Sequence, residues 1–136
     1  VKELAERHAD QIVLAVDVWQ DHVMIEGWKT RSAFSAEGYI QSFAGTPFAA
    51  IIITDIGADI RETDASVSLV SRLAELAKVP VIASGIVRTT DDIARLRILD
   101  KVSGAIVGRA LFNKTIDLKE ALREARPGHE RVADFI

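Results

Sequence analysis

Four short apolar runs separated by amphipathic stretches constrain the fold of this chain more than any other feature of its sequence. Each run is nearly continuous in Val, Ile, Leu and Ala, and a polar residue or a glycine follows it. The runs are residues 12–16, 49–53, 79–83 and 104–107. Apolar runs of this length and spacing are typical of buried parallel strands in βα units. The sequence therefore predicts four parallel βα units, in an open doubly wound sheet or in a closed barrel.

The stretches around these runs have the apolar period of helices. We expect helices over residues 1–8, 35–43, 66–77, from 89 or 90 onward, 110–112 and 117–125. Ser35 is the expected N-cap of the second helix, with Gly45 just past its end. The hydroxyl of Thr89 or Thr90 is expected to cap the fourth helix.

The composition excludes several classes of protein. The 136 residues are 49% hydrophobic and 27% charged with a net charge of −3, which gives no indication of a nucleic-acid or membrane surface. The absence of cysteine excludes disulfides, thiolate zinc sites and cysteine nucleophiles, and the three histidines lack metal-ligand spacing. No apolar run approaches the ~20 residues of a membrane span. We expect a cytoplasmic protein without metal or organic cofactor. Because it begins at Val1 within a helical stretch, we expect a piece of a longer protein.

Polar residues follow the first two runs at positions where parallel βα folds bind ligands. Asp17 follows the first run, and Thr54 and Asp55 follow the second. The carboxyl ends of parallel strands share one rim, so a carboxylate there is a candidate general acid or base. The alternative is a structural role for Asp17, as a loop cap or as an ion-pair partner of Lys29 or Arg31.

Glycines follow the last two runs, together with a serine and an arginine. Ser84 and Gly85 follow the third run, and Gly108 and Arg109 follow the fourth. Glycine lets a backbone approach an anion closely, and the last two strand ends of such barrels commonly form a phosphate cup with a short helix. We interpret these residues as a phosphate site; the alternative is that the glycines merely allow tight turns.

Residues 19–28 alternate in polarity and predict a hairpin over the mouth of the barrel. Trp28, at its end, could stack on a heterocycle, or it could pack beneath this lid.

Five segments together resemble a known family. They are LAVDVWQDHVMIEGW (14–28), IIITDI (51–56), PVIASG (80–85), AIVGRALF (105–112) and IDLKEAL (116–122). The chain is similar, over nearly its whole length, to the second half of the phosphoribosylformimino-5-aminoimidazole carboxamide ribotide isomerases of histidine biosynthesis. The sister cyclase family shares the barrel and the strand-end Asp, but usually lacks the GW dipeptide and the GRALF-like segment.

The resemblance implies a fold and a reaction. The fold is the C-terminal half of a (β/α)₈ barrel over residues 1–128, followed by a tail at 129–136. The reaction is an Amadori rearrangement of an aminoaldose that carries a phosphate at each end, without cofactor or metal. By the same resemblance Asp17 is the general acid and Thr54 binds the reacting sugar. Trp28 then lies near the carboxamide ring, and the phosphate contacts come from Ser84, Gly85, Gly108 and Arg109.

Two positions depart from the family pattern. Ile60 and Ile86 stand where the family usually has glycine. A β-branched residue takes a positive φ at a cost of about 1–3 kcal/mol, so we expect the phosphate loop to change shape. The family's other catalytic Asp belongs to the first half of the barrel, which this chain does not contain.

Three functions therefore stay open. The chain is a fragment of a working isomerase, or of a diverged paralogue that acts on another phosphosugar, or it is a non-catalytic half-barrel that binds a phosphorylated ligand. A half-barrel exposes apolar edges, so we expect it to join its missing N-terminal half or to self-associate.

Overall fold

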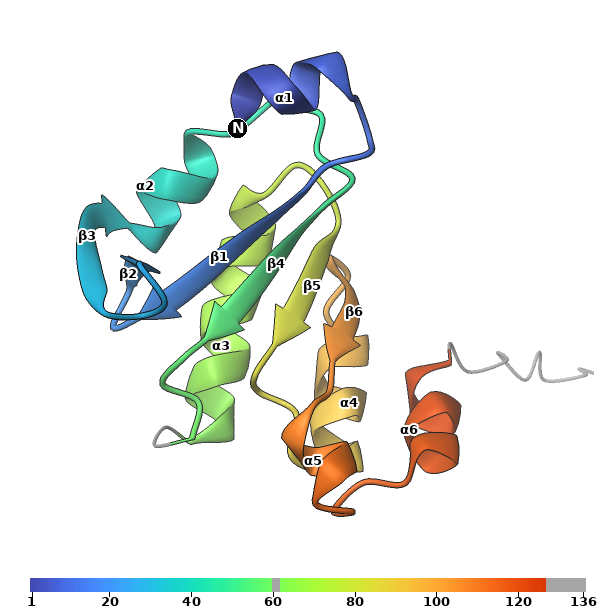
Figure 1. The fold of residues 1–136 in the computed structure, drawn as a ribbon. Coiled ribbons are helices and arrows are strands. Elements are labelled where there is room, and N and C mark those ends of the chain that lie inside the picture. Colours follow the sequence, from blue (N-terminus) through green and yellow to red (C-terminus); the bar gives the residue numbers. More distant parts are fainter. Residues whose placement is uncertain (60–61, 127–136) are drawn as a thin grey trace, which may run out of the picture.

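The computed structural model of the chain describes residues 1–59 and 62–126. Within these residues one sheet of six strands forms the centre, in the order β3-β2-β1-β4-β5-β6 (Figure 1). The strands are β1 (Val13–Trp19), β2 (His22–Ile25), β3 (Thr30–Ser35), β4 (Ala50–Asp55), β5 (Val81–Ser84) and β6 (Val102–Ile106). β1, β4, β5 and β6 are parallel neighbours, whereas β2 and β3 run antiparallel. The prediction of four parallel strands is confirmed.

Helices follow the parallel strands, as βα units require. They are α1 (Lys2–Arg7), α2 (Ala36–Gln41), α3 (Thr63–Leu76), α4 (Thr90–Arg97), α5 (Arg109–Phe112) and α6 (Leu118–Ala125). α3 and α4 lie along one face of the sheet, and α5 lies beyond the carboxyl ends of the strands (Figure 1). This is the architecture of half of a (β/α)₈ barrel. None of the helices in the described residues is long and apolar enough to cross a membrane.

The core lies between the sheet and its helices. Val16, Ile53 and Ala83 point toward the helix layer and are at most 1% exposed. On the opposite face Val13 is 47% exposed and Ile106 is 46% exposed. The strands are apolar on both faces, but the described part of the chain covers only one of them.

The structure corrects the sequence interpretation at the first strand and after it. β1 does not end at Asp17 but continues to Trp19, because its last three residues pair with β2. The expected hairpin is present, and it carries a further strand, β3, that the sequence interpretation did not assign. Gln20 and Asp21 form its first turn with φ of 47° and 63°, as in type I′ turns. Ser35 caps α2 as predicted, its hydroxyl accepting from the Gly38 N–H at 3.1 Å.

The loop between β5 and α4 is held by a capping box. Oδ2 of Asp92, which is 5% exposed, accepts the backbone N–H groups of Arg88 and Thr89 at 2.9 Å each. We expect Asp92→Ala to lower the unfolding free energy of the full-length protein by about 1–3 kcal/mol, because two N–H groups lose a carboxylate acceptor. Urea unfolding measures this loss. Asp91→Ala, in the same helical turn but exposed, is the control, and an equal loss in both variants would contradict the capping role.

Candidate active site

Three polar side chains lie in one row across the sheet. The strand register places Asp17 of β1 beside Thr54 of β4, and Thr54 beside Ser84 of β5. Side chains alternate between the two faces of a strand, and the residues that precede Asp17, Thr54 and Ser84 are buried toward the helices. The row therefore lies on the uncovered face, near the carboxyl ends of the strands. Adjacent strands are about 4.8 Å apart, so the row brings a carboxylate and two hydroxyls within reach of one small substrate.

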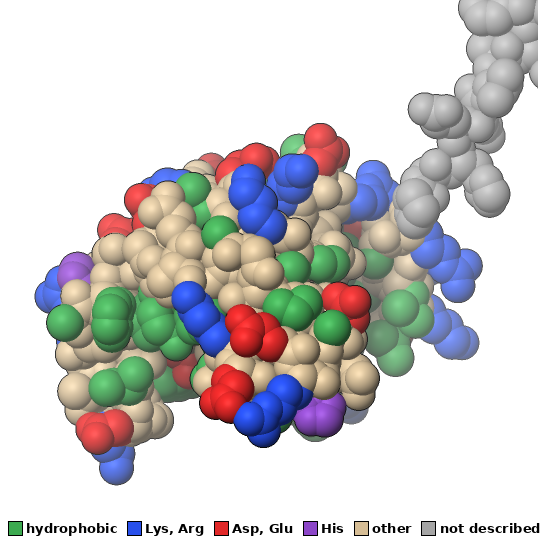
Figure 2. All heavy atoms as spheres, turned by 90° about the horizontal axis from the view of Figure 1, so that it is seen from above, with side chains coloured by type: hydrophobic (Ala, Val, Ile, Leu, Met, Phe, Trp, Pro, Cys, Tyr) green, Lys and Arg blue, Asp and Glu red, His purple; other side chains and the backbone are tan. Residues whose placement is uncertain are grey.

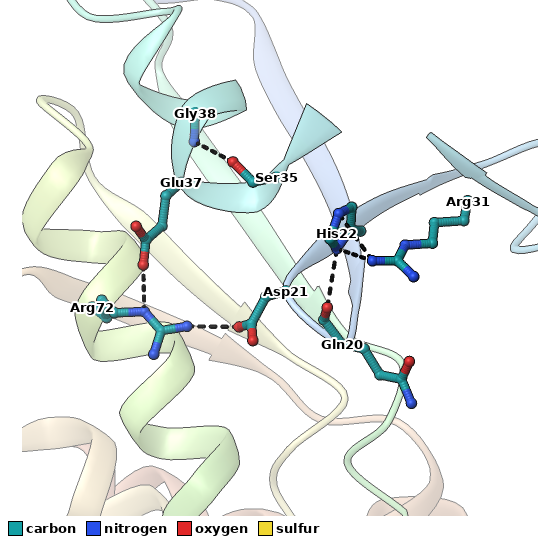
Figure 3. A network of polar contacts seen from close by, with 8 residues as sticks. All are labelled: Gln20, Asp21, His22, Arg31, Ser35, Glu37, Gly38 and Arg72. Carbon is teal, nitrogen blue, oxygen red and sulfur yellow. Dashed lines mark hydrogen bonds and ion pairs between the residues drawn. The ribbon is translucent and has the colours of Figure 1, made fainter. Parts of the chain in front are cut away.

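The side chain of Trp28 contacts Asp17, the first residue of this row. Its indole N–H donates to Oδ2 of Asp17 at 2.8 Å. Asp17 thus has a tryptophan partner instead of an ion pair with Lys29 or Arg31. Arg31 instead lies against His22, with its Nη2 2.7 Å from the imidazole Nδ1 (Figure 3). Contact of Trp28 with the candidate acid supports a place at the site rather than a packing role beneath the hairpin.

The backbone at Trp28 is strained. Glu26, Gly27 and Trp28 have φ of 55°, 64° and 69°, in the left-handed region that non-glycine side chains rarely adopt. Such conformations cost of order 1–3 kcal/mol and persist where surrounding contacts fix them. Here the contacts are the indole bond to Asp17 and a 2.6 Å bond from the Thr30 hydroxyl to Glu26 across the turn. The turn is therefore shaped to present its indole to the carboxylate.

Gly85 follows the row at the end of β5. Its φ of +83° requires glycine, and a Cβ there would lie 3.2 Å from the backbone oxygen of Asp55. The change of shape that we expect in this loop, where Ile86 follows Gly85, stays a prediction. Ile86 does not adopt a positive φ, and its side chain is 1% exposed within the core. The isoleucine therefore strains no left-handed position. Ile60, the second departure, lies outside the described residues.

Gly108 and Arg109 lie at the end of β6, the neighbour of β5. α5 begins at Arg109, which confirms the expected short helix. The Arg109 side chain is 73% exposed, and its Nη2 lies 2.6 Å from Oδ2 of Asp59, in the loop after β4. The structure thus places Gly85, Gly108 and Arg109 at the same rim, while Arg109 has a carboxylate partner that the sequence did not indicate.

The sequence interpretation gave no separate role to Asp55. It is 2% exposed and lies on the helix side of β4, opposite in direction to Thr54. Its carboxylate accepts the Gly57 N–H at 2.9 Å and the Ser66 hydroxyl at 2.8 Å. Because side chains alternate along a strand, the position of Asp55 directly after Thr54 already indicated that the two side chains point to opposite faces of the sheet. Asp55 therefore fixes the loop after β4 to α3 and does not face the substrate side.

The described residues contain no group of three His, Cys, Asp or Glu side chains that could hold a metal ion. The carboxylate and hydroxyl groups of the row are able to take part in proton transfer and hydrogen bonding. A carboxylate held by an indole can exchange a proton with a substrate oxygen, and the hydroxyls of Thr54 and Ser84 can bind neighbouring polar groups.

The chain is similar to proteins that are named as imidazole-4-carboxamide isomerases. It is 56% identical over 135 residues to 1-(5-phosphoribosyl)-5-((5-phosphoribosylamino)methylideneamino) imidazole-4-carboxamide isomerase 2 of Ruegeria pomeroyi, covering 99% of this chain and 55% of that protein. It is 54% identical to isomerase 1 of Ruegeria sp. strain TM1040, covering 100% of this chain and 55% of that protein. The isomerase of Caulobacter vibrioides is 41% identical, covering 90% of this chain and 52% of that protein.

The chain thus spans about half the length of the relatives it matches. The sequence profile of the family described as "Histidine biosynthesis protein" matches residues 1–117. A match over this share of the chain, together with the four βα units, shows that the chain belongs to the histidine biosynthesis protein family.

Proposed function

We propose that the full-length protein containing this chain is an aldose–ketose isomerase. Its substrate would be the phosphoribosyl aminoimidazole carboxamide intermediate of histidine biosynthesis, converted in the cytoplasm by an Amadori rearrangement. The observation that carries the proposal is the row of Asp17, Thr54 and Ser84, with Trp28 bonded to its carboxylate. This row belongs to a chain that is 56% identical to an imidazole-4-carboxamide isomerase.

In this proposal Asp17 is the general acid. The indole of Trp28 engages Oδ2, so the proton to be donated is carried on Oδ1. Donation to the ribose ring oxygen breaks the bond between that oxygen and C1 and leaves a protonated imine at C1. A base then removes the C2 proton, and the enolamine that forms is protonated at C1 and loses the proton of its C2 hydroxyl to give the ketone at C2. Thr54, one strand away, is placed to hydrogen-bond the sugar hydroxyls. The base belongs to the half of the barrel outside this chain.

One phosphate of the substrate would bind where β5 and β6 end. Ser84 supplies a hydroxyl donor, and Gly85 and Gly108 supply backbone without a side chain in the way. Arg109 supplies a positive charge that is 73% exposed. An arginine is suited to this task because its guanidinium presents several donors to an oxyanion. Trp28 would lie against the carboxamide-bearing ring of the substrate.

The uncovered face of the sheet is proposed to be the inner face of the complete barrel. Residues 1–128 would form one half-barrel with 129–136 as a tail, and the missing N-terminal half would close the ring. Val13 and Ile106, at opposite sides of this face, are 47% and 46% exposed in the chain alone. Burial of such apolar surface contributes about 25 cal/mol per Å², which favours closure over an isolated half.

The ordinary backbone of Ile86 is compatible with the isomerase. Ile86 packs into the core without a positive φ, so it adds no backbone strain to the proposed phosphate site. The replaced glycines still distinguish this chain from the usual family pattern, so substrate preference decides between the isomerase and a diverged paralogue. A non-catalytic half-barrel would not require a carboxylate that is hydrogen-bonded to an indole on the uncovered face of the sheet.

Turnover of the histidine-pathway aminoaldose by the purified full-length protein tests the proposal. We expect the ketose product without added metal or cofactor, at kcat values in the common enzyme range of about 1–10³ s⁻¹. Other aminoaldose phosphates serve as competing substrates. A folded protein that leaves the pathway substrate unchanged but converts another of them would show the paralogue. Inactivity on every substrate, with inorganic phosphate still bound, would show the non-catalytic alternative.

A further inference from the structure

The segment that carries Trp28 runs from the end of β1 to the start of α2 and forms the edge of the sheet. Its two ends are tied together by backbone, since the Ala36 N–H donates to the carbonyl oxygen of Asp21 at 2.8 Å. Between these ends the chain forms the hairpin of β2 and β3. The strained turn at residues 26–28 is the tip of this hairpin, and its indole reaches back to Asp17.

A single arginine holds both ends of this segment from outside. Nη2 of Arg72 lies 2.7 Å from Oδ1 of Asp21, in the first turn of the hairpin. Nε of the same guanidinium lies 2.7 Å from Oε1 of Glu37, in the first turn of α2 (Figure 3). Two different nitrogen atoms therefore bind two different carboxylates, one at each end of the segment.

The helix that carries Arg72 is packed against the core. Arg72 lies on α3, the longest described helix, beside Leu69 and Leu73, which are 2% and 0% exposed in the core. A planar guanidinium with several fixed donors sets the angle between its partners better than a flexible ammonium does. The hairpin base is thus fixed relative to the helix layer, and through it relative to β4.

We propose that Arg72 is a positioning residue, which orients the Trp28 indole on Asp17 by clamping the base of the hairpin. Seen from above, the face of the molecule at the amino ends of the strands shows charged side chains of both signs among apolar ones (Figure 2). Arg72, Asp21 and Glu37 are 49%, 64% and 48% exposed, and exposed ion pairs contribute little to folding stability. Their effect is on geometry: without them only the pairing of β2 with β1 and the Ala36–Asp21 backbone bond hold the base, and the tip of the hairpin shifts against the carboxylate. The consequence for turnover rests on the proposed isomerase function, whereas the consequence for Trp28 does not.

The test uses full-length protein labelled with 5-fluorotryptophan, in which the ¹⁹F resonance that Trp28→Phe removes belongs to Trp28. We expect Arg72→Leu to shift or broaden this resonance and to lower kcat by about 10-fold, since a misplacement of ~1 Å at a reacting group costs up to about 100-fold. Arg72→Lys, which can serve only one carboxylate at a time, is expected to restore part of both signals. Arg95→Leu is the matched control, because Arg95 is 48% exposed and binds Asp64 at 2.7 Å on the neighbouring helix.

An unchanged Trp28 resonance in Arg72→Leu would overturn the proposal, as would an equal change in Arg95→Leu. If the wild-type protein does not turn over the isomerase substrate, the proposed function fails, and the resonance still decides the role of Arg72. Glu37→Ala removes the other carboxylate of the clamp should Arg72→Leu fail to fold. Alanine favours the helical conformation, so this variant keeps α2. A native-like resonance in Glu37→Ala would likewise overturn the clamp.

Discussion

Replacing Asp17 with asparagine in the full-length protein is expected to lower isomerase turnover by about 10²–10⁴-fold, the usual contribution of a positioned general acid. Asparagine keeps the shape of the side chain, and its oxygen can still accept the indole N–H that now lies 2.8 Å from Oδ2. The amide cannot donate a proton to the sugar ring oxygen as a carboxylic acid does. Saturating substrate measures kcat, and urea unfolding is expected to change by no more than about 0.5 kcal/mol.

Asp10→Asn is the control for this substitution. Asp10 precedes β1, so it lies at the opposite end of that strand from the row, and it is exposed. Its φ of 58° is one that asparagine tolerates, so the substitution leaves the backbone unstrained. Turnover of Asp10→Asn should equal that of the wild type. Full activity of Asp17→Asn would remove Asp17 from the proposed chemistry.

The second large effect is expected from Gly85→Ala. The substitution forces alanine to a φ of +83° and sets its Cβ 3.2 Å from the Asp55 backbone oxygen and 3.5 Å from Cγ2 of Thr54. The strained φ costs about 1–3 kcal/mol, and the tight contact adds about 1 kcal/mol or more. Because the carbonyl that must give way belongs to β4, Thr54 shifts with it. We expect a lower urea midpoint, weaker inhibition by inorganic phosphate and reduced kcat.

Gly45→Ala is the control that separates the cost of the positive φ from the cost of the close contact. Gly45 has nearly the same φ, +84°, but a Cβ there meets nothing within 4 Å. It follows α2, away from the row, so only the conformational cost is expected and turnover should stay native. Equal stability and equal turnover for Gly85→Ala and Gly45→Ala would mean that close approach at Gly85 has no role in the site.

The parallel part of the fold could be predicted because its signal is local. Each strand is a run of apolar residues, and each run ends within three residues of the observed strand end. β3 escaped prediction because Thr30–Ser35 has no regular apolar alternation, and its strand conformation depends on pairing with β2. The Gln20–Asp21 turn lacks the glycine that usually marks such turns, so the extension of β1 past Asp17 had no signal either.

The candidate site was predictable in its residues but not in its contacts. Strand ends meet at one rim, so Asp17, Thr54 and Ser84 could be grouped from their positions alone. The bond between Trp28 and Asp17 depends on three successive left-handed residues, which no periodicity indicates. The Arg109–Asp59 and Arg72–Asp21 pairs join residues 50 and 51 positions apart, and charged surface residues offer many such pairings. Contacts of this kind become visible only once the chain is folded.

The hairpin also changes how the strand that bears the acid can open. Asp17 and Val18 pair with β2 on one side and with β4 on the other, whereas Val13–Val16 have a described partner only in β4. The carbonyl of Val18 additionally accepts the Ile56 N–H at 3.0 Å. Backbone that is bonded on both sides does not fray alone, since its local opening must break two ladders at once. We therefore expect the backbone that carries Asp17 to exchange its amide protons more slowly than the start of β1.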